Sequence, residues 1–428
     1  MTTHNALHDH IDMPPVTVAR RMPDRTIQDS WPMIDMRAMR SYRLNRVRQQ
    51  LRKQDIAAAL LFDPVNVRYA TGAGNMPVFR MHFPIGQYCF IPVEGPVVLF
   101  DSPEFAQGAK ELETIDEMRP PTNCREADVG ENAAAHVMRW ANEIADLLST
   151  HGGGNRRLAL DRCEPAQTLA LAGHDIDVLD AQVWMEYARS IKSKEEIDCM
   201  SISIGVCEVG AARIREALEP GVTENELWAL MAHANIAMGG EWLECRLLTS
   251  GGRTNPWLQE ASDRMVRAGE LVAFDTDVVG AFGYCTDFSR TFFCEPGRPS
   301  DNQRKLYGLA YEEVHYNMSL IKAGVGFQEL AEKAYKVPDI YVPQAYGFVA
   351  HGVGICDEWP NIYPLKKLQD LNVDGVIEAG MVLAVESYMG EVGGPEGVKL
   401  ETQVLVTETG VEWLDTFPFE EDLLGREI

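Results

Sequence analysis

The sequence predicts an α/β domain in the first half of the chain and an α+β domain with an antiparallel sheet in the second half. Helix-like and strand-like segments alternate up to about residue 190. A long stripe of apolar residues at helical spacing then begins, and after Gly269 the pattern changes to strands. We therefore expect an N-terminal arm over 1–40, a first domain over 41–190 and a second domain over 191–428.

The first domain is predicted from short elements separated by turns. Residues 1–40 are rich in Met, Pro and Arg without a sustained period, which suits an arm that wraps a neighbouring surface. Glu94-Gly95 is a turn between two apolar runs, and this pattern predicts a β-hairpin. The expected elements are a helix from Tyr42, strands at 57–62, 88–92, 96–100 and 158–160, and a helix at 133–148.

The second domain is predicted to begin with two helices. Apolar residues from Ile197 to Leu218 are spaced alternately by three and four, as on one face of a helix. Pro220-Gly221 ends this helix, and Thr223 with Glu226 forms a capping box for the next one. Later segments are expected as strands at 271–278, 284–293, 381–388 and 398–407, with helices at 303–321 and 328–335.

Composition excludes several classes of partner. The 428 residues carry a formal charge of −25, so neither nucleic acid nor an anionic membrane surface is expected to bind. No apolar run approaches the roughly 18 residues that cross a bilayer. The nine cysteines include no C-x-x-C pair and predict buried thiols in a reducing cytoplasm. A cationic or zwitterionic small molecule is compatible with the charge.

Acidic residues interrupt the apolar, strand-like runs of the second domain. They are Asp275, Asp277, Asp287, Glu386 and Glu401. The two-residue spacing of the first pair predicts that both project from one face of a strand. Buried carboxylates are costly unless they are paired or bind metal, and the nearby Arg and Lys residues are too few. With His351 as a nitrogen ligand, the set predicts two divalent ions such as Fe(II), Mn(II), Co(II) or Zn(II).

Each residue of this set has a more ordinary interpretation when it is considered singly. An isolated acid is more often a helix cap or a salt-bridge partner, and an isolated histidine after a glycine-rich loop is usually structural. Gly352 and Gly354 are weak evidence for a phosphate site, because no helix-opening fingerprint accompanies them. The order of two aspartates, one histidine and two glutamates, with gaps of 10, 64, 35 and 15 residues from Asp277, is much more specific, and it favours the metal site.

Several motifs of the second domain resemble those of the creatinase/prolidase/methionine-aminopeptidase family. They are Ser193-Lys194-Glu195-Glu196, Asp287-Phe288-Ser289-Arg290-Thr291, His351-Gly352-Val353-Gly354, Gly380-Met381-Val382 and Gly397-Val398. The resemblance implies a pita-bread catalytic domain with a dinuclear metal site, preceded by a smaller creatinase-type α/β domain. It also implies that Asp287, His351, Glu386 and Glu401 are ligands, together with one or both of Asp275 and Asp277.

The chain departs from the peptidases of this family at two histidine positions. Trp257 follows Pro256 where peptidases carry one histidine, and Asp357 or Glu358 occupies the place of the second. The first-strand acids also lie 12 and 10 residues before Asp287, on either side of the family's usual spacing. Without those histidines amide hydrolysis lacks its proton shuttle, so peptidase activity is not expected.

These departures resemble the dimethylsulfoniopropionate lyases of the family. That resemblance implies β-elimination to dimethyl sulfide and acrylate, two metal ions with iron favoured over Mn, Zn or Co, and a homodimer. Asp357 is the expected base; the apolar segment around it would raise its pKa, and the charge of nearby metal ions would lower it. Tyr346, Trp257 and Trp359 are expected to hold the sulfonium group of a zwitterionic substrate. The alternatives are an Xaa-Pro-type or creatinase-like C–N hydrolase and a non-catalytic binding module.

Overall fold

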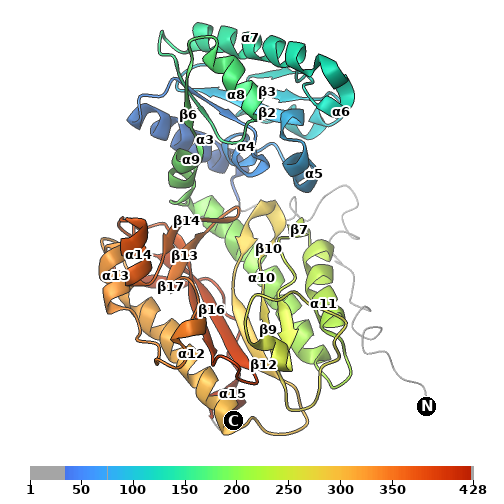
Figure 1. Cartoon of the computed structure of the whole chain (residues 1–428), viewed down its shortest axis with the longest axis vertical. Coiled ribbons are helices and arrows are strands. Elements are labelled where there is room, and N and C mark those ends of the chain that lie inside the picture. Colours follow the sequence, from blue (N-terminus) through green and yellow to red (C-terminus); the bar gives the residue numbers. More distant parts are fainter. Residues whose placement is uncertain (1–33, 75, 426–428) are drawn as a thin grey trace, which may run out of the picture. The chain divides into compact units, whose positions relative to one another are not determined.

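The computed structural model describes residues 34–74 and 76–425 (Figure 1). These residues form two compact units, one over Asp35–Arg189 and the other from Ser190 onward. Of the predicted arm, residues 1–33 lie outside the described part of the chain. The first helix, α3 (Met36–Lys53), begins six residues before the expected start at Tyr42, because Asp35 accepts hydrogen bonds from the backbone of its first turn.

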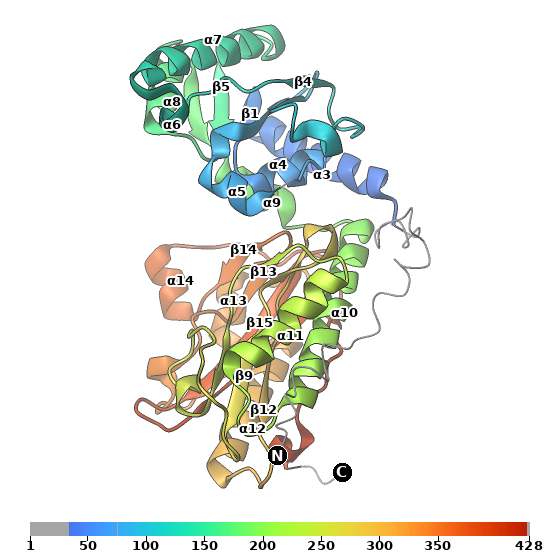
Figure 2. The same cartoon turned by 90° about the vertical axis from the view of Figure 1, so that its right-hand side faces the viewer.

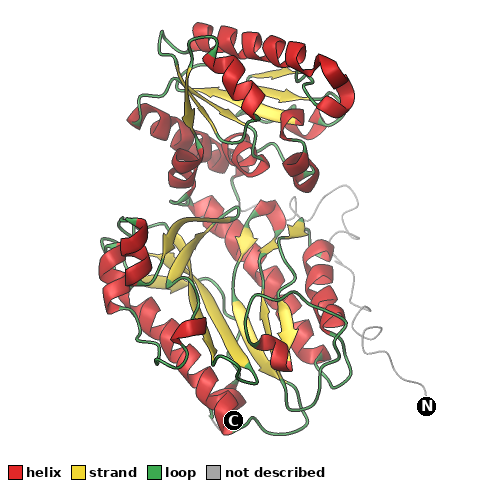
Figure 3. Cartoon of the chain, viewed as in Figure 1, coloured by secondary structure: helices red, strands yellow, loops and turns green. Residues whose placement is uncertain are grey.

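The unit over Asp35–Arg189 is an α/β domain built on one mixed sheet. Its strand order is β4-β3-β2-β1-β5-β6, and the expected hairpin is confirmed as β2 pairs antiparallel with β3. Helices cover both faces of the sheet (Figures 1 and 3). The strands are β1 (Ala58–Leu61), β2 (Gln87–Pro92), β3 (Val98–Asp101), β4 (Glu117–Arg119), β5 (Arg157–Leu160) and β6 (Asp177–Asp180). The remaining helices are α4 (Pro64–Thr71), α5 (Pro77–His82), α6 (Glu126–Val129), α7 (Ala133–His151), α8 (Pro165–Ala172) and α9 (Gln182–Arg189).

The second unit opens with the two predicted helices. Ser193 caps α10 (Lys194–Ala217) and Thr223 caps α11 (Glu224–Ala237), and both caps are reciprocal capping boxes. Both helices lie on the same side of the unit, against the strands of two small sheets (Figure 2). The later helices are α12 (Asp301–Leu320), α13 (Phe327–Lys333), α14 (Leu365–Leu371) and α15 (Glu421–Leu424).

Three antiparallel sheets carry the second unit, in agreement with the predicted α+β class. The largest has the order β14-β13-β15-β16-β17, and α12 packs on β15 and β16. Its strands are β13 (Ala350–Val353), β14 (Asp357–Ile362), β15 (Val382–Gly390), β16 (Gly397–Val406) and β17 (Val411–Trp413). The small sheets contain β8 (Leu248–Ser250), β9 (Leu271–Asp275) and β12 (Ser289–Phe293), and β7 (Trp242–Leu243), β10 (Val278–Val279) and β11 (Cys285–Thr286).

The expected strands at 271–278 and 284–293 are each divided in two. The first is interrupted between Asp275 and Val278, and the second between Thr286 and Ser289. Both interruptions contain acidic side chains of the candidate site, which therefore leave the regular pleat. Among the described residues, no helix is long and apolar enough to span a membrane.

Candidate metal centre and active site

The centre of the candidate site is the cross-strand pair Glu386 and Glu401. Glu386 on β15 lies directly opposite Glu401 on β16, and both side chains are almost fully buried. Like charges in this position repel each other unless a cation lies between them. Lys399, two residues before Glu401 on the same face of β16, supplies one such cation.

Lys399 is completely buried among the carboxylates. Its Nζ lies 2.6 Å from Glu386 Oε2, 2.9 Å from Glu401 Oε2 and 3.3 Å from Asp275 Oδ2. It also donates to Ser289 Oγ at 2.8 Å. Lys399 was not singled out from the sequence, where the nearby Arg and Lys residues were expected to be too few for the five acids; one lysine does serve three of them. Lys399 lies two residues before Glu401 on the same predicted strand, so their side chains share one face. This spacing could have identified Lys399 from the sequence.

His351 approaches the same acids from β13. Its Nε2 lies 3.0 Å from Glu386 Oε1, 3.2 Å from Asp287 Oδ2 and 3.7 Å from Glu401 Oε1. The pairing of β13 with β15 places His351 opposite Ala384, and its ring contacts the carboxylate of Glu386, two residues farther along β15. The structure thus brings together the histidine and the glutamates that the sequence predicted.

The two aspartates of the first strand do not share one strand face. β9 ends at Asp275, which pairs with Ser289, and Asp277 follows in a left-handed conformation with φ of 38°. Asp277 Oδ2 accepts a hydrogen bond from the Cys245 thiol at 2.9 Å. The expectation of two aspartates on one face is corrected, because the strand breaks between them.

The donor atoms form three groups that could each hold a metal ion, within 4.8 Å. They are Asp275, Asp287 and Glu401; His351, Glu386 and Glu401; and Asp287, His351 and Asp357. Glu401 Oε1 is buried and accepts no hydrogen bond among the described residues, as expected of an atom that faces a cation. The oxygen-rich donor set with one imidazole suits divalent transition metals, so these residues fit such ions. Asp277 belongs to none of the three groups.

Charge in the site is unbalanced. Burial, together with the charge of the neighbouring Glu401, raises the pKa of Asp275 and of Glu386 to about 7. Burial and the Glu401 charge also hold the pKa of Asp287 well above its usual range. Burial opposes the ionisation of Glu401 too, but Lys399 and His351 outweigh it and keep its pKa well below normal. Divalent cations would stabilise the ionised form of all these carboxylates.

Asp357 and Glu358 are adjacent on β14 but have different surroundings. The Asp357 side chain is exposed at the site, and its carboxylate belongs to the group that contains His351 and Asp287. The surrounding protein nevertheless desolvates this carboxyl enough to raise its pKa, while His351 opposes the change. Glu358 points to the opposite side, where it forms a buried ion pair of 2.5 Å with Lys192.

An aromatic pocket lies beside the carboxylates. Trp257, Tyr346, Phe348 and Tyr388 line a cavity of about 350 Å³ that also contacts Gln344. The Tyr346 ring lies 4.7 Å from Lys399 Nζ, and the Phe348 ring centroid lies 5.6 Å from that of His351. These two contacts connect the pocket to the carboxylate cluster. Phe348 and Tyr388 were not among the residues predicted from the sequence.

Of the three aromatic residues predicted to bind substrate, the structure brings two together. Tyr346 and Trp257 both line the aromatic pocket. Trp359 is not among its lining residues; its ring lies 5.5 Å from Phe327 and packs against the hydrophobic core behind the large sheet. Along β14 the exposed Asp357 is followed by the buried Glu358, and the register with β13 then shifts between Glu358 and Asn361, the stretch that contains Trp359.

Comparison with known proteins identifies both halves of the chain. Residues 198–408 match the description of metallopeptidase family M24, and residues 43–191 match the creatinase/prolidase N-terminal domain. The solved structure of an Xaa-Pro dipeptidase from Bacillus anthracis superimposes with a TM-score of 0.70 at 20% identity, covering 89% of this chain and 99% of that one. At this identity the similarity establishes the fold.

Two curated relatives are much more similar in sequence. The chain is 36% identical to a dimethylsulfoniopropionate lyase of Roseovarius nubinhibens, over 92% of this chain and 89% of the relative. A dimethylsulfoniopropionate lyase of Roseobacter denitrificans matches at 36% identity over the same shares. A creatinase of a Bacillus species matches at 25% identity over 54% of this chain and 58% of its own length.

Proposed function

Since the chain belongs to metallopeptidase family M24, with a creatinase-type N-terminal domain, we propose that it is a metal-dependent dimethylsulfoniopropionate lyase. The products would be dimethyl sulfide and acrylate. The observation that carries the proposal is the exposed Asp357 carboxylate beside His351 and Asp287, at a position where peptidases of the family have a histidine.

Asp357 is the proposed general base. It would accept the proton on the carbon next to the substrate carboxylate, the new C=C bond would form, and the C–S bond would break with its electron pair leaving on dimethyl sulfide. The raised pKa makes Asp357 a stronger base than an ordinary aspartate. The buried ion pair of Glu358 with Lys192 favours Asp357 over Glu358 in this role.

The aromatic pocket is the proposed site for the sulfonium end of the substrate. Aromatic faces attract an organic cation by about 0.5–2 kcal/mol each. Tyr346 and Trp257 line this pocket, and Trp359 would contribute indirectly by packing behind β14. The position of Tyr346 between the pocket and Lys399 supports a substrate whose carboxylate lies toward the metal centre.

The acidic cluster is the proposed binding site for two divalent ions, with iron favoured. The ions would be held by Asp275, Asp287, His351, Glu386 and Glu401. Asp277, whose charge interacts with those of Asp275 and Asp357, would lie at the edge of the site. When bound, such ions stabilise the negative charge that develops on the substrate carboxylate. We also propose that the protein is a homodimer and acts in the cytoplasm. None of the nine cysteines forms a disulfide, which agrees with a reducing compartment.

The decisive experiment measures dimethyl sulfide by gas chromatography from purified protein and dimethylsulfoniopropionate, with metal content determined on the same sample. We expect release that stops on chelation and returns when iron is added. A panel of Xaa-Pro dipeptides and creatine serves as the comparison. Release that persists in metal-free protein, or hydrolysis of the panel without dimethyl sulfide, would refute the proposal.

A further inference from the structure

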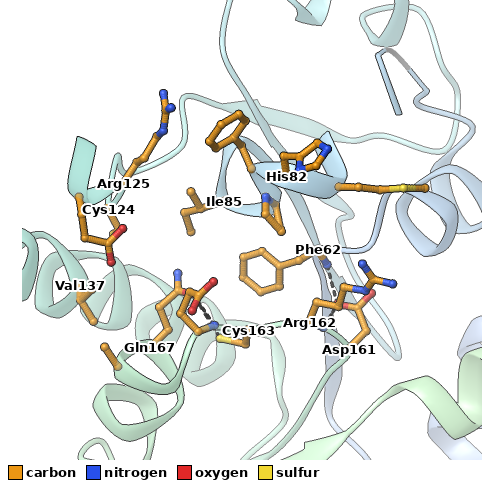
Figure 4. Close-up of a pocket in the computed structure, with 16 residues that line it drawn as sticks. Phe62, His82, Ile85, Cys124, Arg125, Val137, Asp161, Arg162, Cys163 and Gln167 are labelled. Atoms are coloured by element: carbon orange, nitrogen blue, oxygen red, sulfur yellow. Dashed lines mark hydrogen bonds between the residues drawn. The ribbon is translucent and has the colours of Figure 1, made fainter. Parts of the chain in front are cut away.

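A second cavity lies within the N-terminal unit, apart from the residues of the metal centre. It has a volume of about 490 Å³, which is in the usual range of small-molecule sites. Its walls combine apolar side chains, among them Phe62, Ile85 and Val137, with polar and charged ones in about equal share (Figure 4). All its lining residues belong to the Asp35–Arg189 unit.

One wall of this cavity carries a buried hydrogen-bond donor without a partner. Gln167 is 3% exposed, and its Nε2 makes no hydrogen bond among the described residues. Figure 4 shows the Gln167 side chain extending from α8 toward the space below Ile85 and Phe62. Leaving a buried amide N–H unsatisfied costs about 1–3 kcal/mol, so a partner is expected from outside the protein.

The orientation of this amide is determined by its neighbours. Gln167 Oε1 accepts hydrogen bonds from the Glu164 backbone N–H at 3.1 Å and from the Cys163 thiol at 3.5 Å. A reversed amide would place its NH₂ group against the Glu164 N–H, a contact between two donors. The N–H groups of Gln167 are therefore the ones that face away from this turn.

The charges around the cavity determine which ligands it would accept. Asp161 accepts hydrogen bonds from the backbone N–H groups of Phe62 and Asp63, so its oxygens are already engaged. Arg162 is paired with Asp63 at 2.7 Å, and Arg125 stacks 4.0 Å above Phe83. The other charged lining residues are Glu126 and Glu164. Because both lining arginines already have carboxylate partners, Arg162 in Asp63 and Arg125 in Asp128, the three lining carboxylates are not offset and the cavity does not favour an anionic ligand.

We propose that this cavity is a second binding site, for an uncharged, flat aromatic molecule that carries a carbonyl-type hydrogen-bond acceptor. The acceptor takes the N–H of Gln167, and the ring packs against the apolar part of the lining, formed by Phe62, Ile85 and Val137. The first turn of α8 adds its positive dipole end on the same side, which also favours an acceptor there. The site is independent of the metal centre and of the lyase reaction.

Three matched probes test the site on the full-length protein. They are 2-naphthamide, which carries the acceptor; 2-naphthoate, which is the same ring with a charge; and 2-ethylnaphthalene, which lacks the acceptor. Binding is followed by methyl NMR with the Ile85 methyl group as the reporter in the cavity wall, assigned with Ile85→Val. We expect 2-naphthamide to bind most tightly and to shift the Ile85 signal.

Two variants and one control separate this site from non-specific binding. Gln167→Met keeps the length of the side chain but removes the donor, so it should weaken 2-naphthamide by about two- to tenfold and leave 2-ethylnaphthalene unchanged. Ala166→Trp should fill the cavity and abolish binding of all probes. Leu169→Ala, on the same helix but 73% exposed, should change nothing. The proposal would be overturned if a probe bound to saturation without shifting the Ile85 signal. It would also be overturned if Gln167→Met bound each of the three probes as tightly as wild type does.

Discussion

Asp357 and Glu358 are adjacent and chemically similar, but their surroundings differ. Asp357 and Glu358 are both carboxylates on one short strand, but one is exposed beside His351 and the other is buried against Lys192. The pleat of β14 causes the difference, because successive side chains point to opposite faces. Substitution at each position should therefore have a separate and measurable consequence.

The Asp357→Asn variant should lose catalysis without losing stability. Removing a general base costs about 10²- to 10⁴-fold in rate, so kcat should fall by at least about 100-fold while metal content and melting temperature stay near wild type. Glu358→Gln is the matched variant. It leaves Lys192 buried without its charged partner and should lower the free energy of unfolding by about 3–5 kcal/mol. If Glu358→Gln were stable and inactive, the assignment of the base would be reversed.

Lys399 should matter most when no metal is bound. In metal-free protein Lys399→Met removes the cation that separates Glu386, Glu401 and Asp275, so unfolding should become easier by about 3–5 kcal/mol. Denaturant titration with a chelator present measures this change, and added divalent ions should reduce it. The exposed control Lys366→Met should stay within about 0.5 kcal/mol of wild type. An unchanged metal-free Lys399→Met would contradict the structural role given to this lysine.

At the scale of elements, helix α12 places a carboxyl group behind the catalytic sheet. Glu313 on α12 accepts a hydrogen bond from Ser387 of β15 at 2.6 Å, and burial raises its pKa to about 7. Packing between this helix and β15 thus depends on the protonation state of one side chain. The contact also shows how α12 reaches the back of the strand that carries Glu386.

This contact predicts a pH dependence of stability. The pKa of Glu313 is higher in the folded protein than in the unfolded chain, so the folded state favours the protonated form. The loss of stability from keeping Glu313 buried is absent below about pH 4.5, grows as the pH rises toward 7 and is constant above that. The free energy of unfolding of Glu313→Gln, measured by denaturant unfolding, should therefore rise relative to that of wild type as the pH increases from 4.5 to 8. The total increase should be about 2–3 kcal/mol. A difference that does not change with pH would show that Glu313 ionises freely.

At the scale of the whole molecule, the candidate ligands all lie in one of the two units. Asp275, His351 and Glu401 are far along the chain from the core of the N-terminal unit, which is built around residues such as Trp140 and Ile144. Metal binding stabilises only the structure that forms its site. The two units should therefore respond differently to chelation.

Calorimetry should resolve this difference as two transitions, of which chelation lowers one. Ile144→Ala, a cavity-forming change at a fully buried position of α7, identifies the transition of the N-terminal unit because it should destabilise that unit by about 2–5 kcal/mol. The other transition should be the one that chelation lowers. An equal shift of both transitions on chelation would mean that the two units unfold together.

The sequence by itself determined the order of the elements and the chemical type of the site. The stripe of α10, the capping boxes and the strand-like runs depend on local spacing, which can be read from neighbouring residues. The set of acids with His351 was also recognisable, because buried carboxylates require a cation wherever they are placed.

The tertiary structure decided which side chains meet. The register of β15 with β16 places Lys399 between the acids, the end of β9 at Asp275 turns Asp277 toward Cys245, and the core behind β14 receives Trp359. Each of these outcomes depends on pairing between strands that are distant in the chain, or on where a strand stops. Local sequence cannot specify them, because a shift of one residue exchanges the two faces of a strand.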